Sequence, residues 1–188
     1  MHEKRFSREI SRLREPERVA RLEVDRVVQL ALAGVSRPGS MLDIGTGSGL
    51  FAEKFASLGI RVTGVDVNPK MLPAASEHVP AGKFHEGVAE RLPFPDASFD
   101  LVFMGLLLHE TDDPLAALRE AHRVGTGRLA ILEWPEEAQD FGPPPEHRLP
   151  NQTIISLAEK AGFEKVESRR LQNLVLYLAD RRQPPHDR

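Results

Sequence analysis

Three glycines at alternate positions, Gly45, Gly47 and Gly49, follow the short apolar run "MLDI" (41–44) and precede an amphipathic stretch. Glycines in such a turn reach positive φ and let the backbone approach a ligand closely. A helix that starts there offers free N–H groups and the positive end of its dipole, which suits an anion. The pattern therefore predicts a strand–turn–helix unit that holds an anionic or nucleotide-like ligand.

The spacing of the glycines narrows the choice of ligand. A dinucleotide fingerprint needs a third glycine where this chain has Leu50, and the Gly-Lys-Ser/Thr ending of a Walker loop is absent. The pattern present is Asp-x-Gly-x-Gly-x-Gly, beginning at Asp43, and a second apolar run ends in Asp66. A carboxylate at that place can accept hydrogen bonds from both hydroxyls of a ribose. Alternatively, the glycines serve only helix–strand packing and Asp66 only forms a turn.

Apolar runs that read as strands alternate with amphipathic runs that read as helices. The expected strands are residues 41–44, 61–67, 83–88, 99–107, 128–134, 163–171 and 173–180. The expected helices are residues 16–31, 50–58, 69–78, 114–124 and 151–161, with Asp113 and Asn151 as N-caps of the last two. Strands separated by helices pair in parallel, because each crossover needs a covering helix. The last two strands should instead form an antiparallel hairpin with a tight turn at Gln172–Asn173.

Length and composition bound the function classes. A chain of 188 residues favours one domain. Its net charge of −3 is not suited to binding nucleic acid, which is itself strongly negative. The chain has no cysteine, which excludes disulfides and thiolate chemistry, and its histidines lack metal-ligand spacing, so we expect no metal site. No apolar run approaches the length of a membrane span, and the N-terminus has no secretory pattern. We therefore expect a cytoplasmic protein.

Taken in order, the motifs resemble those of the class I S-adenosylmethionine-dependent methyltransferases, and within them the small-molecule group related to ubiquinone/menaquinone-biosynthesis methyltransferases. The matching segments are "LDIGTGSG", "VTGVDVNPKML", "AERLPFPDASFDLVF", "LLLHETDDPLAALREAHRV" and "LAILEW". The resemblance implies an α/β fold: a doubly wound, mostly parallel seven-stranded sheet in the order 3-2-1-4-5-7-6, with strand 7 antiparallel and helices on both faces. It places a Rossmann-like methyltransferase domain at 37–182, after an N-terminal helical segment (1–36) that could act as a lid and before a tail (183–188).

The resemblance also implies S-adenosyl-L-methionine as the cofactor, with S-adenosyl-L-homocysteine as its product. The glycine turn should surround the methionine part, the residues after the second and third strands should enclose the ribose and adenine, and the end of the fourth strand should lie near the sulfonium. The implied cofactor-binding residues are Asp43, Gly45, Thr46, Gly47, Gly49, Asp66, Val67, Asn68, Met71, Val88, Ala89, Glu90 and Met104. Met71 could equally be helix core. Family members often carry an aspartate at the position of Val88, so the adenine amino group would need Glu90, a backbone carbonyl or water.

Candidates for catalysis follow the fourth and fifth strands. Methyl transfer from a sulfonium is an in-line displacement, so the protein mainly positions the acceptor and removes its proton where needed. His109 has an unperturbed pKa that suits a general base at neutral pH, although a structural histidine bonded to nearby backbone is the alternative. Glu133 could orient an acceptor or only bond neighbouring loops. Arg148, in the proline-rich loop 141–150, could hold an anionic acceptor or lie in solvent.

These residues favour transfer of a methyl group to a small-molecule acceptor at O, N or C. A non-catalytic S-adenosylmethionine-binding scaffold or regulatory module is the alternative from another class. A nicotinamide-dependent oxidoreductase is a third hypothesis, which the glycine spacing disfavours. The expected partner is the small-molecule acceptor, with no nucleic acid and no membrane span. The short chain leaves the acceptor pocket to the N-terminal segment, the loops or a second subunit, so a homodimer is also considered.

Overall fold

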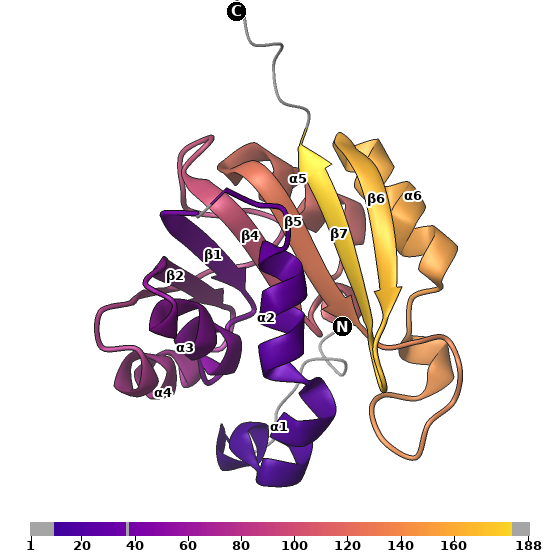
Figure 1. Ribbon diagram of the computed structural model, residues 1–188, viewed down its shortest axis with the longest axis horizontal. Helices are drawn as coiled ribbons and strands as arrows, with labels where there is room; N and C mark the ends of the chain where they lie inside the picture. Colours follow the sequence, from indigo (N-terminus) through magenta and orange to yellow (C-terminus); the bar gives the residue numbers. More distant parts are fainter. Residues whose placement is uncertain (1–9, 37, 182–188) are drawn as a thin grey trace, which may run out of the picture.

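A seven-stranded sheet forms the centre of the molecule, in the order β3-β2-β1-β4-β5-β7-β6 (Figure 1). The computed structural model describes residues 10–36 and 38–181. Strand β7 (Val175–Arg181) runs antiparallel to both of its neighbours, β5 (Gly125–Glu133) and β6 (Phe163–Arg170), and the other pairs are parallel. The strand order and the direction of strand 7 predicted from the sequence are therefore confirmed.

The remaining elements follow the expected alternation of strands and helices. The other strands are β1 (Ser40–Ile44), β2 (Arg61–Asp66), β3 (Lys83–Glu86) and β4 (Phe99–Gly105). The α-helices are α1 (Pro16–Leu22), α2 (Val24–Leu32), α3 (Leu50–Ser57), α4 (Met71–His78), α5 (Pro114–Val124) and α6 (Asn151–Ala161), and the 3-10 helices are η1 (Ile10–Arg14), η2 (Leu108–Glu110) and η3 (Pro145–His147). No helix in the described part of the chain is long and apolar enough to cross a membrane.

Two apolar layers hold the helices against opposite faces of the sheet. On one face, α2 and α3 pack on the sheet, and the ring centroids of Phe51 and Phe55 lie 4.7 and 5.6 Å from that of Phe103 on β4. On the other face, α5 and α6 bury Leu118 and Ile154 (Figure 1). The doubly wound architecture expected from the sequence is thus the observed one, and it leaves the carboxyl ends of the parallel strands open to a ligand.

The predicted cap of α5 is confirmed, whereas that of α6 is wrong. Asp113 Oδ1 accepts a hydrogen bond from Ala116 N at 3.0 Å, and Pro114 occupies the first position of the helix. At α6 the cap position belongs to Pro150, and Asn151 is already helical. The Asn151 amide oxygen instead accepts a hydrogen bond from the Tyr177 hydroxyl of β7. A tertiary partner for the side chain therefore replaces the local cap that the sequence suggested.

The N-terminal segment is broken where the sequence predicts one continuous helix. Glu23 has φ 46 and ψ 44, in the left-handed region, and separates α1 from α2. Its carboxylate accepts hydrogen bonds from Arg26 Nη1 at 3.0 Å and from Gln172 N at 2.8 Å, in the β6–β7 turn. The break lets α2 pack on the sheet while α1 turns below it (Figure 1). Residues 1–9 of the expected lid, Arg37, and residues 182–188 at the C-terminal end lie outside the described residues.

Strand β6 forms one edge of the sheet, and most of its side chains are charged. Its register against β7 shifts between Glu164 and Glu167, where Lys165 has φ 51. Arg169 and Glu167 form an exposed ion pair at 2.6 Å, and Arg170 pairs with Glu137 at 3.3 Å. The two-residue turn predicted at Gln172–Asn173 is confirmed, because Leu171 N donates to Leu174 O at 2.9 Å across it.

Candidate cofactor and acceptor site

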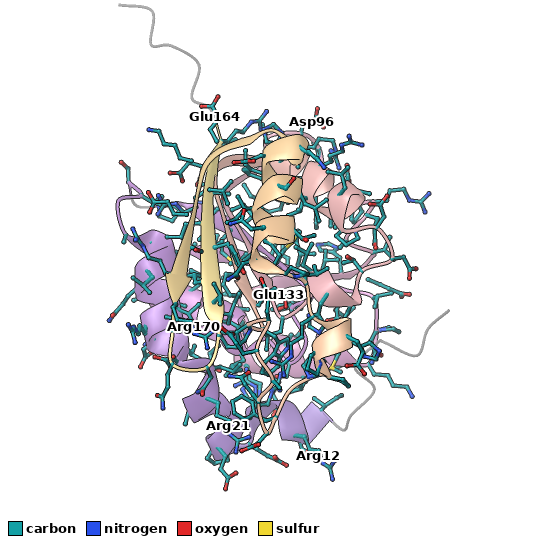
Figure 2. The ribbon with its side chains drawn as sticks, turned by 90° about the vertical axis from the view of Figure 1, so that its right-hand side faces the viewer. Arg12, Arg21, Asp96, Glu133, Glu164 and Arg170 are labelled. Carbon is teal, nitrogen blue, oxygen red and sulfur yellow. The ribbon has the colours of Figure 1, made fainter. Side chains whose placement is uncertain are left out.

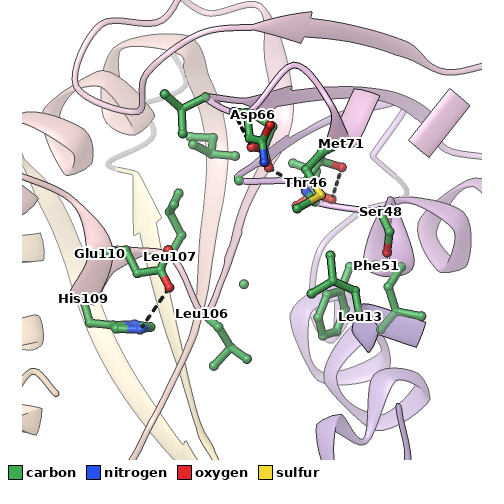
Figure 3. A pocket seen from close by; sticks show the side chains of 18 of the residues that line it. Leu13, Thr46, Ser48, Phe51, Asp66, Met71, Leu106, Leu107, His109 and Glu110 are labelled. Carbon is green, nitrogen blue, oxygen red and sulfur yellow. Dashed lines mark hydrogen bonds and ion pairs between the residues drawn. The ribbon is translucent and has the colours of Figure 1, made fainter. Parts of the chain in front are cut away.

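A cavity of about 1200 Å³ opens beyond the carboxyl ends of β1, β2 and β4. The glycine turn after β1 and Asp66 at the end of β2 form one part of it. Residues 105–107, 109–112 and 141–144 form the side nearer β5, and η1 and α1 add residues from the N-terminal segment. This is the edge of the sheet at which an open α/β fold binds its ligands. Figure 3 shows Asp66, Thr46 and Met71 near one another, with His109 and Glu110 across the cavity from Leu13 and Phe51.

The structure brings the residues predicted to bind the cofactor to this cavity, with two exceptions, Gly49 and Met104. The predicted residues that line it are Asp43, Gly45, Thr46, Gly47, Asp66, Val67, Asn68, Met71, Val88, Ala89 and Glu90. They come from the ends of three neighbouring strands, β1, β2 and β3, and the turns that follow them. Residues distant in the sequence thus share one side of one cavity.

Gly49 and Met104, the two exceptions, do not line this cavity. Met104 is not beyond the fourth strand but inside β4, where its side chain is fully buried in the core. The cavity lining begins one residue later, at Gly105 and Leu106, because the strand extends to Gly105. Gly49 has φ 76, and a Cβ there would lie 3.0 Å from Ala75 Cα on α4. Packing between helices, rather than exposure to the cavity, accounts for this glycine.

The glycine turn is held by the end of β2. The backbone N–H groups of Gly45 and Thr46 both donate to Val65 O, at 2.8 and 3.0 Å. Gly45 has φ 72, and a Cβ there would lie 2.9 Å from Leu107 Cδ1. Both the backbone conformation and the lack of space therefore require glycine at this position. The result is a fixed turn whose backbone faces the cavity.

Asp66 connects the glycine turn to the end of β2. Its Oδ2 accepts from Gly47 N and its Oδ1 from Asn68 N, each at 2.8 Å. Burial raises the pKa of Asp66 above its usual value, and these two hydrogen bonds offset part of the rise. The carboxylate lies at the cavity with oxygen lone pairs still available, so it can accept further hydrogen bonds from a ligand.

Asp43 and Ser48 are the most buried polar groups of the turn. Thr46 Oγ1 donates to Asp43 Oδ2 at 2.8 Å, and burial together with the nearby charge of Asp66 raises the pKa of Asp43 to about 7. Ser48 is 2% exposed and lines the cavity, and its Oγ has no hydrogen-bond partner within the described chain. A buried hydroxyl without a partner is costly, so it is suited to a polar ligand group. Sequence reasoning missed Ser48, although it stands between two of the glycines.

The expected adenine side of the cavity is mostly apolar. Met71 is 4% exposed, so it belongs both to the buried side of α4 and to the cavity lining. Glu90 Oε1 accepts from Asp112 N at 3.0 Å, which ties it to the loop before α5. Val88 and Arg91 form an isolated β-bridge that shapes the turn between them. Recognition of a polar ring edge here depends on the backbone more than on Val88.

The two residues proposed for catalysis form a buried pair. Glu133 is 1% exposed, and its Oε2 lies 2.8 Å from His109 Nδ1. His109 N and Trp134 N donate to the same carboxylate, both at 3.2 Å. His109 also lines the cavity, with Glu110 Oε1 3.8 Å from its Nε2. Burial lowers the pKa of His109, but the charge and hydrogen bond of Glu133, together with the charge of Glu110, outweigh it, so the pKa lies above its usual value.

Arg148 does not lie in solvent and does not offer its guanidinium to a ligand. It is 6% exposed and donates to the carbonyl oxygens of the loop that precedes it. These oxygens belong to Pro135, Glu137, Phe141 and Pro143, at 3.1, 2.6, 3.2 and 2.9 Å. Its guanidinium also lies 5.6 Å from the Trp134 ring centroid. The side chain therefore shapes the loop that forms one wall of the cavity, and the anion-binding alternative does not fit.

Apolar side chains that the sequence analysis did not assign complete the cavity. They are Leu13, Leu22, Phe51, Leu106, Leu107, Trp134, Phe141 and Leu174. Leu106 has φ 56, an uncommon conformation for a non-glycine residue, and its N–H bonds Leu132 O at 2.8 Å. These residues come from five separate segments, so no single sequence window identifies them. In residues 10–36 and 38–181, no group of three or more His, Asp or Glu side chains is placed to hold a metal ion.

Comparison with known proteins agrees with this fold. A family described as a methyltransferase domain matches residues 42–130. An uncharacterized methyltransferase of Synechocystis sp. is 34% identical over 170 residues, which cover 79% of this chain and 80% of that protein. The demethylmenaquinone methyltransferase of Chlorobaculum parvum is 40% identical over 89 residues, 47% of this chain and 37% of that enzyme. The crystal structure of a SAM-dependent methyltransferase from Aquifex aeolicus superposes with a TM-score of 0.79, at 26% identity, covering 91% of this chain and 96% of that one.

The chain belongs to the class I S-adenosylmethionine-dependent methyltransferases. The extended match to the Synechocystis protein and the shared seven-stranded fold establish this family. Membership confirms the cofactor expected from the sequence, S-adenosyl-L-methionine. The chain matches well under half the length of the Chlorobaculum enzyme, 37%, so that enzyme's own reaction does not carry over directly.

Proposed function

We propose that this protein transfers a methyl group from S-adenosyl-L-methionine to a small-molecule acceptor. One observation carries the proposal: the cavity has the glycine turn and Asp66 on one side and the buried His109–Glu133 pair on the other. The cofactor supplies a methyl group that is already activated on a sulfonium sulfur. The protein is then left to bind, to orient and to manage one proton.

The residues of the glycine turn fit the cofactor. Asp66 offers a carboxylate to the two hydroxyls of a ribose, and Asp43 lines the cavity beside it, hydrogen-bonded to the Thr46 hydroxyl. Ser48 Oγ, buried and without a partner in the described chain, is available to a polar group of the methionine part. Val67, Asn68, Met71, Val88, Ala89 and Glu90 would enclose the adenine. Gly45 and Gly47 then act through their backbone, while the Thr46 hydroxyl also holds Asp43.

His109 is the group that would take a proton from the acceptor. Glu133 accepts from Nδ1, which in the neutral ring leaves the lone pair on Nε2. Because the pKa of His109 is raised, the neutral, basic form gains population only as the pH rises. Glu133 touches neither the cavity nor a ligand in this arrangement, so it acts by positioning His109. The sequence analysis considered Glu133 as a group that orients the acceptor, whereas in this proposal it orients the base, His109.

The acceptor would lie between His109 and the apolar wall. Leu106 and Leu107 stand beside His109, while Trp134 and Phe141 extend the wall toward the N-terminal segment. Apolar walls exclude water from the reacting groups, which favours a cation that loses charge in the reaction. The relatives include enzymes named for demethylmenaquinone and for malonyl-[acyl-carrier protein]. We infer an acceptor with an apolar body and one acidic O–H or N–H group.

The N-terminal segment supports the idea of a lid. Leu13 of η1 and Leu22 of α1 line the cavity together with Arg12 and Arg21. Figure 2 shows Arg12 and Arg21 at one end of the molecule, with Glu133 nearer its centre. In this proposal residues 10–22 cover the acceptor side of the cavity. A homodimer, the absence of a nucleic-acid partner and a cytoplasmic location stay predictions.

A non-catalytic binding module is the weaker alternative. Such a module needs the cofactor residues but not a buried, hydrogen-bonded histidine–glutamate pair at the opposite side of the cavity. Burying a carboxylate is unfavourable unless it is paired, so the pair requires its own explanation. General-base catalysis provides one.

Isothermal titration with S-adenosyl-L-homocysteine and NAD, followed by a methyl-transfer assay, tests the proposal. We expect the first compound to bind and NAD not to bind. With isotope-labelled cofactor and a panel of phenolic, enolic, carboxylate and amine acceptors, we expect labelled product, and His109→Asn should reduce kcat without changing cofactor affinity. Binding of NAD instead would point to the oxidoreductase. Cofactor binding with no turnover across all acceptors would favour the scaffold.

A further inference from the structure

Arg14 joins the N-terminal segment directly to the glycine turn. It is the last residue of η1, and its Nη2 donates to the backbone carbonyl of Ser48 at 2.9 Å. Its Nη1 lies 2.6 Å from Glu53 Oε2 in the first turn of α3. One guanidinium therefore bonds both the turn that lines the cavity and the helix that follows it. Arg14 itself is not among the residues that line the cavity.

The preceding residue covers the same turn. Leu13 is 9% exposed and lines the cavity. A Cβ built on Gly47 would lie 3.5 Å from Leu13 Cδ1, which places the leucine directly over that glycine. Figure 3 shows Leu13 close to Ser48 and Phe51. Two consecutive residues of η1 thus hold two consecutive residues of the turn.

The carbonyl that Arg14 binds belongs to a peptide unit that is held from both sides. The N–H of the same unit is that of Gly49, which donates to Thr46 O at 2.9 Å. With the carbonyl bonded to Arg14, the plane between Ser48 and Gly49 cannot rotate without breaking one of the two bonds. The backbone that carries Ser48 Oγ, the buried hydroxyl without a partner in the described chain, is thereby held in place.

We propose that Arg14 is a positioning residue of the cofactor site, and that it couples docking of residues 10–22 to cofactor binding. The inference rests on the cofactor site assigned above and goes beyond it. A turn already held in its binding shape loses less conformational freedom when a ligand binds. Coupling of two binding equilibria is reciprocal. If docking of residues 10–22 tightens cofactor binding by some factor, bound cofactor stabilises the docked segment by the same factor.

The segment is anchored on the far side of the cavity as well. The Arg21 guanidinium lies 4.7 Å from the Phe141 ring centroid, on the loop that Arg148 shapes. Residues 10–22 therefore reach from the glycine turn to the acceptor wall. Arg21 is 48% exposed at its side chain, so this anchor is the weaker one. Cofactor bound at the glycine turn would thus also stabilise residues 10–22 in their position over the acceptor side of the cavity.

Titration of S-adenosyl-L-homocysteine into matched variants tests the coupling. We expect Arg14→Gln to raise the Kd about five- to tenfold, a typical coupling between sites. Glu53→Gln should change it less than about twofold, because that carboxylate is half exposed and does not touch the turn. Arg14→Lys, which keeps the charge but not the fork, should fall between them. Arg169→Gln, in an exposed pair on β6, is the control and should match the wild type.

Amide hydrogen exchange distinguishes the proposed coupling from a purely structural role of Arg14, because a structural role would not make exchange in residues 10–22 depend on the ligand. In the wild type, S-adenosyl-L-homocysteine should slow amide exchange in residues 10–22, and in Arg14→Gln this effect should be lost. An unchanged Kd in Arg14→Gln overturns the proposal, even if its Tm falls, because Arg14 would then serve stability alone. Failure of the wild type to bind the compound overturns the cofactor site itself. The two failures are thus distinguishable.

Discussion

Glu133 accepts two hydrogen bonds from one residue, His109: one from the ring Nδ1 at 2.8 Å and one from the backbone N at 3.2 Å. The double contact fixes both the ring and the start of η2 against the end of β5. Since Glu133 is 1% exposed, the pair is shielded from solvent and from salt. The orientation of His109 therefore depends on β5 and not on the loop that carries the histidine.

Glu133→Gln should shift the pH dependence of turnover toward lower pH. Glu133 raises the pKa of His109 through its charge and hydrogen bond, so removing the charge lowers that pKa. The neutral base is then populated at lower pH, and the rise of kcat/KM with pH moves in the acid direction. We also expect kcat at the plateau to fall about tenfold or more, because a weaker base takes the proton less readily.

The pKa of His109 can be followed directly by nuclear magnetic resonance of the labelled imidazole. Glu167→Gln is the control, since Glu167 forms an exposed ion pair with Arg169 on β6. An unchanged histidine pKa in Glu133→Gln would contradict the electrostatic role of the pair. An unchanged plateau rate would contradict its role in catalysis.

In the unliganded protein, the free energy of unfolding should fall less between about pH 4 and pH 7 in Asp43→Asn than in the wild type. The pKa of Asp43 is raised from 3.8 to about 7, so between these values the folded state binds more protons than the unfolded state. Its contribution is fully present below the unfolded pKa and is lost as pH rises through the folded one. A tenfold difference in proton affinity between the folded and unfolded states corresponds to about 1.4 kcal/mol of stability. Urea unfolding across this range, with exposed Asp25→Asn as control, measures the difference.

Alanine at three glycines should separate packing from binding. Gly49→Ala should lower the free energy of unfolding by roughly 2–4 kcal/mol, because it combines the left-handed backbone cost with a 3.0 Å contact to Ala75 Cα. Gly59 has φ 83, and an added Cβ there would meet nothing within 4 Å. Gly59→Ala should therefore lower the free energy of unfolding by the backbone cost alone. At Gly47 an added Cβ would make only an ordinary contact to Leu13. We therefore expect Gly47→Ala to weaken cofactor binding more than it lowers the free energy of unfolding. Equal unfolding energies for Gly49→Ala and Gly59→Ala would contradict the packing role.

Arg148→Lys should loosen the loop 135–147 and raise the KM for the acceptor. Lysine cannot replace a planar fork that bonds four backbone carbonyls at once, so several of these oxygens would lose their partner. Cofactor affinity should stay within about twofold of the wild type, because Arg148 does not contact the glycine turn. Limited proteolysis reports the loop, and Arg169→Lys is the control. Equal changes in acceptor KM and cofactor Kd would argue for a general loss of structure.

The sequence predicts the sheet well, and most of the residues it assigns to the cofactor line one cavity, because both rely on local signals. Glycines, the acid at the end of β2 and the alternation of strands and helices are visible within short windows. The strand order was an implication of the resemblance, and the structure confirms it. Asp113 acts locally as a cap and was found, whereas Asn151 bonds a distant tyrosine and was misjudged.

The acceptor side could not be read from the sequence because its contacts join distant segments. Arg148 looked like a surface cation, yet four carbonyl oxygens of one loop bury it. Arg14 lies 34 residues from Ser48 and 39 from Glu53, and no pattern connects them. Met104 lies one residue before the cavity lining begins at Gly105, but it is still inside β4, which is covered on both faces, so its side chain is in the core.

The charged outer strand β6 has a consequence for self-association. Alternating acids and bases, an irregular register and a left-handed residue at Lys165 make its free edge a poor template for another chain. Two copies would therefore not join their sheets edge to edge through β6. The opposite edge, β3, has only the four residues Lys83–Glu86, so it offers another chain little length for strand pairing.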